Sequence, residues 1–203
     1  VLWPAIEAVM ARYPDIRVEL SIDGALTNIV ADRFDAGVRL GEHVEKDMIA
    51  IPIGPELRML AVGSPTYFAR YKLPATPRDL TAHDCINLRM ATRGDLYAWE
   101  FERDGHVLNV RVEGRLIVND TDTAIRAALA GQGLAFVMAD RIETELASGS
   151  LIPVLEDWSP PFAGHHLYYP DRRNMTPAFR VLLDELRVRH QSRRSTGASR
   201  RNV

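Results

Sequence analysis

Several side chains that could bind a small anion stand where the sequence predicts that strands end or helices begin. Arg39 and Arg89 carry guanidinium groups, which match a carboxylate with two parallel hydrogen bonds. Asn119 and Thr121 stand at the start of a helical stretch, whose free N–H groups and positive end attract negative charge. A helix dipole contributes about 0.3–1 kcal/mol, whereas micromolar affinity needs about 8 kcal/mol. Direct hydrogen bonds and a cation must therefore supply most of the affinity.

Simpler interpretations of these residues remain open. An arginine beside a strand is often a surface residue or the partner of a nearby acid, here Asp35. Capping alone explains Asn119 and Thr121. Only the expected convergence of three segments favours a binding site: the turn containing Asp23 and Gly24, the strand end at residues 39–41, and residues 119–123.

The glycines that follow this helix do not form a nucleotide site. Residues 119–137 run from possible N-cap residues through a helix to Gly131 and Gly133, and then into the apolar run 134–138. A dinucleotide-binding loop has the opposite order, in which a strand leads through glycines into a helix. We therefore interpret the two glycines as turn residues that end the helix before a buried strand.

The sequence offers little support for catalysis. Ser64 lacks the glycines two residues before and after it that a nucleophile elbow requires, and it suits a helix cap before Pro65. The histidines are scattered, and the adjacent pair at residues 165–166 would alternate faces of a strand. Cys85, the single cysteine, is interpreted as a half-buried structural thiol. We predict no catalytic residue, no metal site and no cofactor, and therefore no enzyme.

Composition indicates a globular protein. The 203 residues are 46% hydrophobic and 26% charged, with a net charge of −2 and a pI near 6.3, so the chain as a whole has no electrostatic footprint for nucleic acid or anionic membrane. No apolar run approaches the length of a membrane span, and the first residues do not resemble a signal peptide. The cytoplasm is the expected location.

Hydrophobic periodicity predicts an alternation of helices and strands. Helices are expected after Pro4, over residues 26–34, 66–71 and 140–146, and from Thr176 to near residue 190; strands are expected over residues 17–22, 35–40, 49–53 and 58–62, among others. This alternation predicts right-handed crossovers and a largely parallel sheet. Residues 97–102 and 106–113 instead predict an antiparallel hairpin, because Asp104 and Gly105 form a tight-turn signal between them. The arginine-bearing tail, residues 191–203, is expected to be disordered and solvated rather than bound to nucleic acid.

The motifs, taken in order, resemble one family. Residues 13–20 (YPDIRVEL), 34–41 (FDAGVRLG), 61–67 (AVGSPTY), 85–89 (CINLR), 119–137 and 155–158 (LEDW) are similar to the effector-binding domain of LysR-type transcriptional regulators. Each motif is loose by itself, but their order and spacing over residues 1 to about 190 are specific.

The resemblance implies two Rossmann-like α/β lobes of the periplasmic-binding-protein type II kind, joined by two crossover strands with a ligand cleft between them. It places lobe I at residues 1–84 plus 165–190 and lobe II at residues 85–164. The family's winged helix-turn-helix and the opening strand of the effector domain are not in this sequence, so DNA contact is expected only through that separate N-terminal domain.

The resemblance also implies a role and partners. A small organic effector, expected to be anionic, would bind between the lobes to residues that include Asp23, Gly24, Arg39, Gly41, Asn87, Arg89, Asn119 and Thr121. A homodimer is expected, with a tetramer in the full-length protein, and the interface would use Ile6, Met10, Val18, Leu20, Ile125 and Leu129. The alternative is an extracytoplasmic solute-binding protein of a transporter, which shares these lobes.

Overall fold

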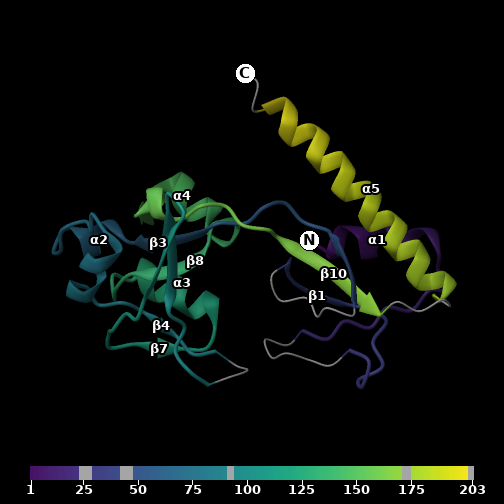
Figure 1. Ribbon diagram of the computed structural model, residues 1–203, viewed down its shortest axis with the longest axis horizontal. Helices are drawn as coiled ribbons and strands as arrows, with labels where there is room; N and C mark the ends of the chain where they lie inside the picture. Colours follow the sequence, from purple (N-terminus) through teal and green to yellow (C-terminus); the bar gives the residue numbers. More distant parts are fainter. Residues whose placement is uncertain (23–28, 42–47, 91–93, 171–174, 201–203) are drawn as a thin grey trace. The chain divides into compact units, whose positions relative to one another are not determined.

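The computed structural model describes residues 1–22, 29–41, 48–90, 94–170 and 175–200, with side chains described through residue 192. The chain forms two compact units, each described here by itself (Figure 1). Unit 1 combines Val1–Glu56 with Ala163–Val203, and unit 2 is Leu57–Phe162.

The described residues of unit 1 form an antiparallel sheet and two helices. Its strands are β1 (Gly37–Leu40), β2 (Met48–Pro52) and β10 (His165–Pro170), in the order β1-β10-β2, and its helices are α1 (Trp3–Arg12) and α5 (Pro177–Arg200). Pro4 stands in the first turn of α1, where the missing N–H costs nothing. Ala5, Ile6 and Val9 are the buried residues of this helix, at the spacing of one helical face.

Unit 2 contains three small sheets. The largest has the order β8-β3-β9, built from β3 (Met59–Gly63), β8 (Ala135–Met138) and β9 (Ile152–Val154) in antiparallel pairs. Strands β4 (Asn87–Leu88) and β7 (Ile117–Val118) pair in parallel, and β5 (Trp99–Arg103) and β6 (His106–Val110) form a hairpin. The helical elements are α2 (Pro65–Phe68), η2 (Pro77–Ala82), α3 (Thr121–Leu129), η3 (Ala139–Arg141), α4 (Glu143–Ser148) and η4 (Glu156–Trp158).

Two hydrophobic clusters hold unit 2 together. In one of them the rings of Trp99 and Phe136 stack with centroids 5.2 Å apart, and Phe101 lies 5.1 Å from Phe136. In the other, Ala124, Ile125 and Ala128 of α3 pack with residues of β3 and β8. Alternation along β3 places Ala61 in the first cluster and Leu60 and Val62 in the second, so both faces of this strand are buried.

The predicted α1, α3 and hairpin are confirmed, but the predicted parallel sheet is wrong. The parallel pairs among the described residues are β4 with β7 and an isolated bridge between Cys85 and Leu134. In unit 1, β10 returns from late in the chain and lies between β1 and β2; in unit 2, β3 lies between β8 and β9. The alternation of elements predicted that successive strands would pair in parallel through crossover connections. Instead, strands that are distant in the sequence pair in antiparallel fashion.

Two elements near the N-terminus also differ from the prediction. Residues 17–22 alternate in polarity but form no strand, and Leu20 and Ile22 are 49% and 96% exposed. A strand needs a neighbour that completes its hydrogen bonds, and no strand of the described part of the chain pairs with this segment. Residues 29–33 form turns rather than a helix, ending with Arg33 at a positive φ of 60°. The remainder of that predicted helix, residues 26–28, lies outside the described residues.

The boundary between the units differs from the predicted lobe boundary. Residues 57–84, which the sequence assigned to lobe I, belong to unit 2 because β3 pairs with β8 and β9. The chain passes between the units at Glu56–Leu57 and again at Phe162–Ala163. Leu57 and Phe162 exchange backbone hydrogen bonds of 3.0 and 2.8 Å, so the two connecting segments pair as antiparallel chains where unit 2 begins and ends.

The predicted disordered tail is wrong for residues 191–200, which continue α5 to Arg200. The segment has no proline that would break the helix, and its arginines, glutamine and alanine are good helix formers, whereas its glycine and its four Ser and Thr residues are not. Arg189 also forms an ion pair of 2.7 Å with Glu185 one turn earlier, which supports the helix locally. Residues 201–203 lie outside the described residues.

Candidate ligand site

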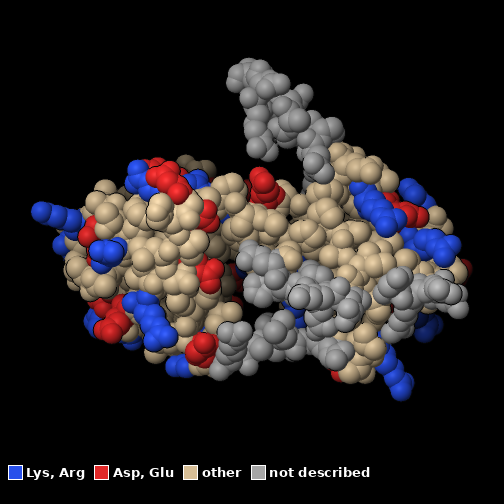
Figure 2. Space-filling view, in the orientation of Figure 1, with Lys and Arg blue, Asp and Glu red and all other residues tan. Residues whose placement is uncertain are grey.

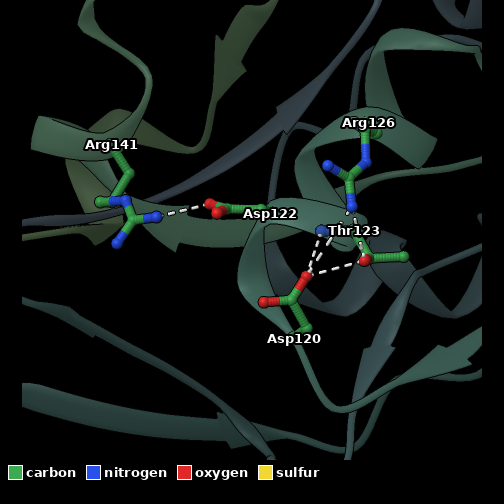
Figure 3. Close-up of polar contacts among 5 residues, drawn as sticks. All are labelled: Asp120, Asp122, Thr123, Arg126 and Arg141. Atoms are coloured by element: carbon green, nitrogen blue, oxygen red, sulfur yellow. Dashed lines mark hydrogen bonds and ion pairs between the residues drawn. The ribbon is translucent and has the colours of Figure 1, made fainter. Parts of the chain in front are cut away.

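The N-terminus of α3 is closed by Asp120. The Asp120 carboxylate accepts hydrogen bonds from the Thr123 backbone N–H at 2.8 Å and from the Thr123 hydroxyl at 2.7 Å (Figure 3). These bonds hold the pKa of Asp120 below its usual value, with the Thr123 hydroxyl as the largest cause. Asn119 precedes the cap position and Thr121 is the first helical residue, so neither is the cap. Among the oxygens that the sequence offered, Asp120 therefore takes the capping position.

The charges at this helix end balance. Asp120 lies 4.0 Å from the guanidinium of Arg126, and Asp122 forms an ion pair of 2.5 Å with Arg141 (Figure 3). An anion that approached the helix would meet two carboxylates whose charges are matched by two arginines. The dipole of α3 is already complemented by an acid of the protein itself, so the helix end alone is a weaker anion site than the sequence suggested.

Two parallel strands end beside this helix. β4 and β7 pair Asn87 with Ile117 and Leu88 with Val118, and the Arg89 N–H continues the pairing with a 2.7 Å bond to the Val118 carbonyl. Asn119 and α3 follow directly after β7. The pairing thus brings the segment of Asn87 and Arg89 beside the segment that leads to Asn119 and Thr121, at one edge of unit 2. The carboxyl ends of parallel strands next to a helix N-terminus are a common ligand position in α/β proteins.

Asn87 is a buried amide with an unused acceptor. It is 3% exposed, and its Nδ2 donates to the Cys85 carbonyl at 3.3 Å. Its Oδ1 has no hydrogen-bond partner in the described part of the protein. A buried acceptor without a partner costs free energy, so such groups often mark positions where water or a ligand binds.

Asn87 also lines an open groove of about 680 Å³ within unit 2, which sequence analysis did not find. Its other lining residues come from loops and strand ends, whose approach no local pattern encodes: Tyr71, Thr81, Ala82, His83, Asp84, Leu96, Val112, Glu113, Gly114 and Ile117. His83 Nδ1 lies 3.1 Å from the Tyr67 hydroxyl, and that hydroxyl accepts from the Asp84 N–H at 3.1 Å. Burial lowers the pKa of His83, against the opposing charge of Asp79, and raises the pKa of Tyr67 to about 12.

The remaining predicted ligand residues are distributed as follows. Arg89 is exposed and its guanidinium donates to the Gly94 carbonyl, which is a local contact. Arg39 and Gly41 lie in unit 1, where Arg39 on β1 stands opposite His166 of β10. A Cβ on Gly41 would lie 2.7 Å from the His166 ring, so the glycine permits this close approach. Asp23 and Gly24 lie outside the described residues.

The glycines after α3 are turn residues, as predicted. The Gly131 N–H bonds to the Ala128 carbonyl and the Gln132 N–H to the Ala127 carbonyl, the paired bonds of a Schellman motif, with Gly131 at a φ of +71°. Gly133 has a different reason to be glycine, because its Cβ would lie 2.4 Å from the Asp84 carbonyl oxygen. This close approach lets Leu134 pair with the chain on either side of Cys85.

The predicted interface residues differ in exposure. Met10 and Leu20 are 48% and 49% exposed, and Val18 and Leu129 are half-buried. Ile6 and Ile125 are 2% and 8% exposed, because each packs in the core of its own unit. Ile6 and Ile125 therefore stabilise their own units rather than a contact with a partner chain.

The described residues contain no group of three or more His, Cys, Asp or Glu placed to hold a metal ion. The thiol of Cys85 is buried, which raises its pKa to about 12. Within the same described residues, no helix is both long enough and apolar enough to cross a membrane.

Comparison with known proteins identifies the family. The model of the LysR substrate binding domain matches residues 1–191, and the chain belongs to this family, the effector-binding part of LysR-type transcriptional regulators. The HTH-type transcriptional regulator PgrR of Escherichia coli K12 is 43% identical over 189 residues, which cover 93% of this chain and 63% of PgrR. YcaN of the same organism, an uncharacterized HTH-type transcriptional regulator, is 41% identical over 177 residues, covering 87% of this chain and 57% of YcaN.

Solved structures agree on the fold. The full-length structure of AphB, the Vibrio cholerae virulence activator of the LTTR family, matches with a TM-score of 0.77 at 23% identity, over 92% of this chain and 62% of AphB. The regulatory domain of CrgA from Neisseria meningitidis matches with a TM-score of 0.71 at 24% identity, over 92% of this chain and 90% of that domain. The chain thus has the type II periplasmic-binding-protein fold and spans about three fifths of the curated relatives it matches.

Proposed function

We propose that this chain is the effector-sensing and oligomerisation domain of a LysR-type transcriptional regulator. A small organic anion binds to it and changes the relative arrangement of the two units, and this change is transmitted to attached DNA-binding domains. The family is one of transcriptional regulators rather than enzymes, which leaves a solute-binding role in a transporter without support from any relative described above.

One observation carries the proposal: the parallel strands β4 and β7 end together at the N-terminus of α3. This arrangement brings polar side chains to one edge of unit 2, and Asn87 of β4 has a buried Oδ1 with no partner among the described residues. Arg89 at the same edge is the candidate cation. Because Arg126 and Arg141 balance Asp120 and Asp122, the α3 terminus contributes hydrogen-bonding groups without a net repulsive charge.

The two chain segments that connect the units are where a change in the arrangement of the units would occur. The chain passes between the units at Glu56–Leu57 and at Phe162–Ala163, so a change in their relative arrangement involves the backbone angles near these two crossings. Such a shift requires that the ligand bind one arrangement more tightly than the other, and coupling of this kind typically amounts to about 1–3 kcal/mol.

We also propose a homodimer that uses the exposed apolar residues of unit 1. Met10 of α1 and Leu20 after it are about half exposed, and Trp3 and Ile22 are 63% and 96% exposed. Trp3 and Met10 stand seven residues apart on α1 and therefore near one face of this helix, and large exposed apolar side chains that share a face are typical of an interaction surface. Sedimentation velocity of the wild type and of Met10→Glu/Leu20→Glu tests this proposal, because the charged pair is expected to shift the wild type toward monomer.

A thermal-shift screen against organic acids, amino acids and aromatic carboxylates tests the ligand. At a hundred times its dissociation constant a ligand stabilises the protein by about 2.7 kcal/mol. A hit is expected to lose its effect in Arg89→Ala and Thr121→Ala. It should keep its effect in Arg78→Ala, which removes an exposed arginine from η2 of the same unit.

Asp120→Asn separates charge from capping. Asparagine keeps an oxygen for the Thr123 N–H and removes the negative charge at the helix end. A ligand anion at this edge should therefore bind more tightly to Asp120→Asn than to the wild type. An unchanged affinity in Asp120→Asn, Arg89→Ala and Thr121→Ala alike would place the ligand elsewhere.

A further inference from the structure

The groove at Asn87 lies on the face of the β4–β7 pair that points away from α3. Ile86 and Val118 pack in the hydrophobic cluster that contains α3. Successive side chains of a strand point to opposite faces, so Asn87 and Ile117, which stand opposite each other in the register, point away from that cluster. Both residues line the groove, and no residue of α3 is among its described lining residues. The groove is therefore a surface of unit 2 distinct from the end of α3.

The side chains that line this groove carry negative charge and no balancing cation. Asp84 and Glu113 are acidic, and none of the described lining residues is Lys or Arg. His83 adds no positive charge at neutral pH, because burial lowers its pKa from an ordinary value near 6.5. In Figure 2, by contrast, acidic and basic side chains are interspersed over the described surface of the face shown. The groove therefore favours a cationic ligand.

The two acids differ in their partners. Asp84 lies 3.6 Å from Arg115, but the Arg115 side chain is 80% exposed and does not line the groove. An ion pair so exposed to solvent contributes little. Glu113 is exposed and has no ion pair within the described part of the chain. The Cys85 N–H donates to the Glu113 carbonyl at 2.9 Å, which holds the segments of the two acids side by side.

Asn87 adds a buried hydrogen-bond acceptor to this wall. Its side-chain amide faces the Cys85 carbonyl at 3.3 Å, and a carbonyl only accepts, so the group that faces it is the NH2. The free atom is therefore Oδ1, which has no partner among the described residues although Asn87 is 3% exposed. A partner for Oδ1 must donate a hydrogen bond, which a carboxylate does not, whereas an ammonium group has three N–H donors.

We propose that this groove binds a small organic amine, whose ammonium group donates to Asn87 Oδ1 and lies beside Glu113 and Asp84. Its apolar body lies against Leu96 and Ile117, which line the groove and are 40% and 47% exposed. This site goes beyond effector sensing at the α3 end, because it is a second site for a ligand of opposite charge. It does not depend on the anion or on the dimer proposed above.

An inorganic cation fits the groove less well than an amine. The described residues contain no group of three or more His, Cys, Asp or Glu placed to hold a metal ion. Hard cations such as Mg²⁺ and Ca²⁺ need several oxygen ligands around them, whereas large apolar side chains form part of this groove. An ammonium group attached to an apolar body uses both kinds of lining.

Isothermal titration calorimetry with phenethylamine near neutral pH tests the proposal. The amine should bind one site per chain, and hydrocinnamate, which joins the same ring and linker to a carboxylate, should not compete with it. Asn87→Leu removes the buried acceptor and should weaken amine binding at least tenfold. Glu113→Gln should weaken it about threefold, because an exposed charge is screened. Arg115→Gln should strengthen it about twofold, since Asp84 loses its competing partner.

Glu102→Gln is the matched control. It removes an exposed acid from β5 of the same unit and gives the same net charge as Glu113→Gln. Circular dichroism checks the fold of each variant, and Glu113→Gln, at an exposed position, keeps the test decisive if Asn87→Leu unfolds. Wild-type amine affinity in Glu102→Gln and in Arg89→Ala supports the proposal. Arg89→Ala also separates this site from the anionic effector, whose binding it should abolish.

Several results would overturn the amine site. These are no binding of phenethylamine to the wild type, unchanged affinity in both Asn87→Leu and Glu113→Gln, or an equal loss in Glu113→Gln and Glu102→Gln, which would reduce the effect to overall charge. Loss of amine binding in Arg89→Ala would place the amine at the α3 end instead. Displacement of the amine by Mg²⁺ at equal ionic strength would assign the groove to a metal ion.

Discussion

Gly133→Ala should destabilise the protein far more than a glycine substitution normally does. A Cβ at this position would lie 2.4 Å from the backbone oxygen of Asp84, which cannot rotate away as a side chain could. Relieving this overlap costs about 1–3 kcal/mol. It also weakens the bonds from the Leu134 N–H to Asp84 (2.9 Å) and from the Ile86 N–H to Leu134 (2.8 Å), each contributing about 1 kcal/mol. The expected loss of unfolding free energy is about 4 kcal/mol.

Gly149→Ala is the control, and urea denaturation is the measurement. Gly149 ends α4 at a φ of +70° and has no atom within 4 Å of its Cβ position, so alanine there has only the left-handed backbone penalty of about 1–2 kcal/mol. The midpoint should fall much further for Gly133→Ala than for Gly149→Ala, at similar m-values. Equal losses in the two variants would refute the argument that close approach to Asp84 requires Gly133.

Three further predictions concern unit 2. Phe136→Ala should cost about 3–5 kcal/mol in urea denaturation, because the 7% exposed ring stacks on Trp99; a loss below 1 kcal/mol would contradict this packing. Because burial lowers the pKa of His83, the folded state favours the neutral ring. The contribution of the neutral ring to the free energy of unfolding is therefore complete above about pH 6.5 and is lost as pH falls below that value. The fall in stability between pH 7.5 and 5.5 should therefore be smaller in His83→Gln, and an equal fall would exclude His83 as its source. Cys85, with its pKa raised to about 12, should resist a thiol reagent at pH 8 in the native protein and react in urea; rapid native labelling would contradict its burial.

Local secondary structure could be predicted from the sequence wherever a few neighbouring residues determine the backbone conformation. Pro4 and the apolar spacing predicted α1, Asp104 and Gly105 predicted the hairpin turn, and the glycines after α3 predicted its end. The start of α3 was predicted within residues 119–123, but its cap is Asp120 rather than Asn119 or Thr121. The family resemblance named Asn87, Arg89, Asn119 and Thr121 as ligand residues, and the pairing of β4 with β7 brings their segments side by side; their contact with a ligand stays a prediction.

Features that depend on distant segments could not be read in this way. Alternating polarity at residues 17–22 describes a possible strand face but supplies no neighbouring strand. β10 lies between β1 and β2 although more than a hundred residues separate it from either, so no local pattern shows that the sheet is antiparallel. The groove at Asn87 is likewise built by loops that meet only in the folded unit. The tail was predicted to be disordered because its polar composition suits both a solvated coil and a helix.

Small-angle X-ray scattering with and without a saturating ligand hit tests the central claim most directly. If ligand binding changes the relative arrangement of the two units, the distance distribution of the protein should shift on ligand addition. The shift should be absent in Arg89→Ala at the same ligand concentration. A ligand that binds one site per chain, as measured by calorimetry, yet leaves the scattering curve of the wild type unchanged would contradict the sensing mechanism.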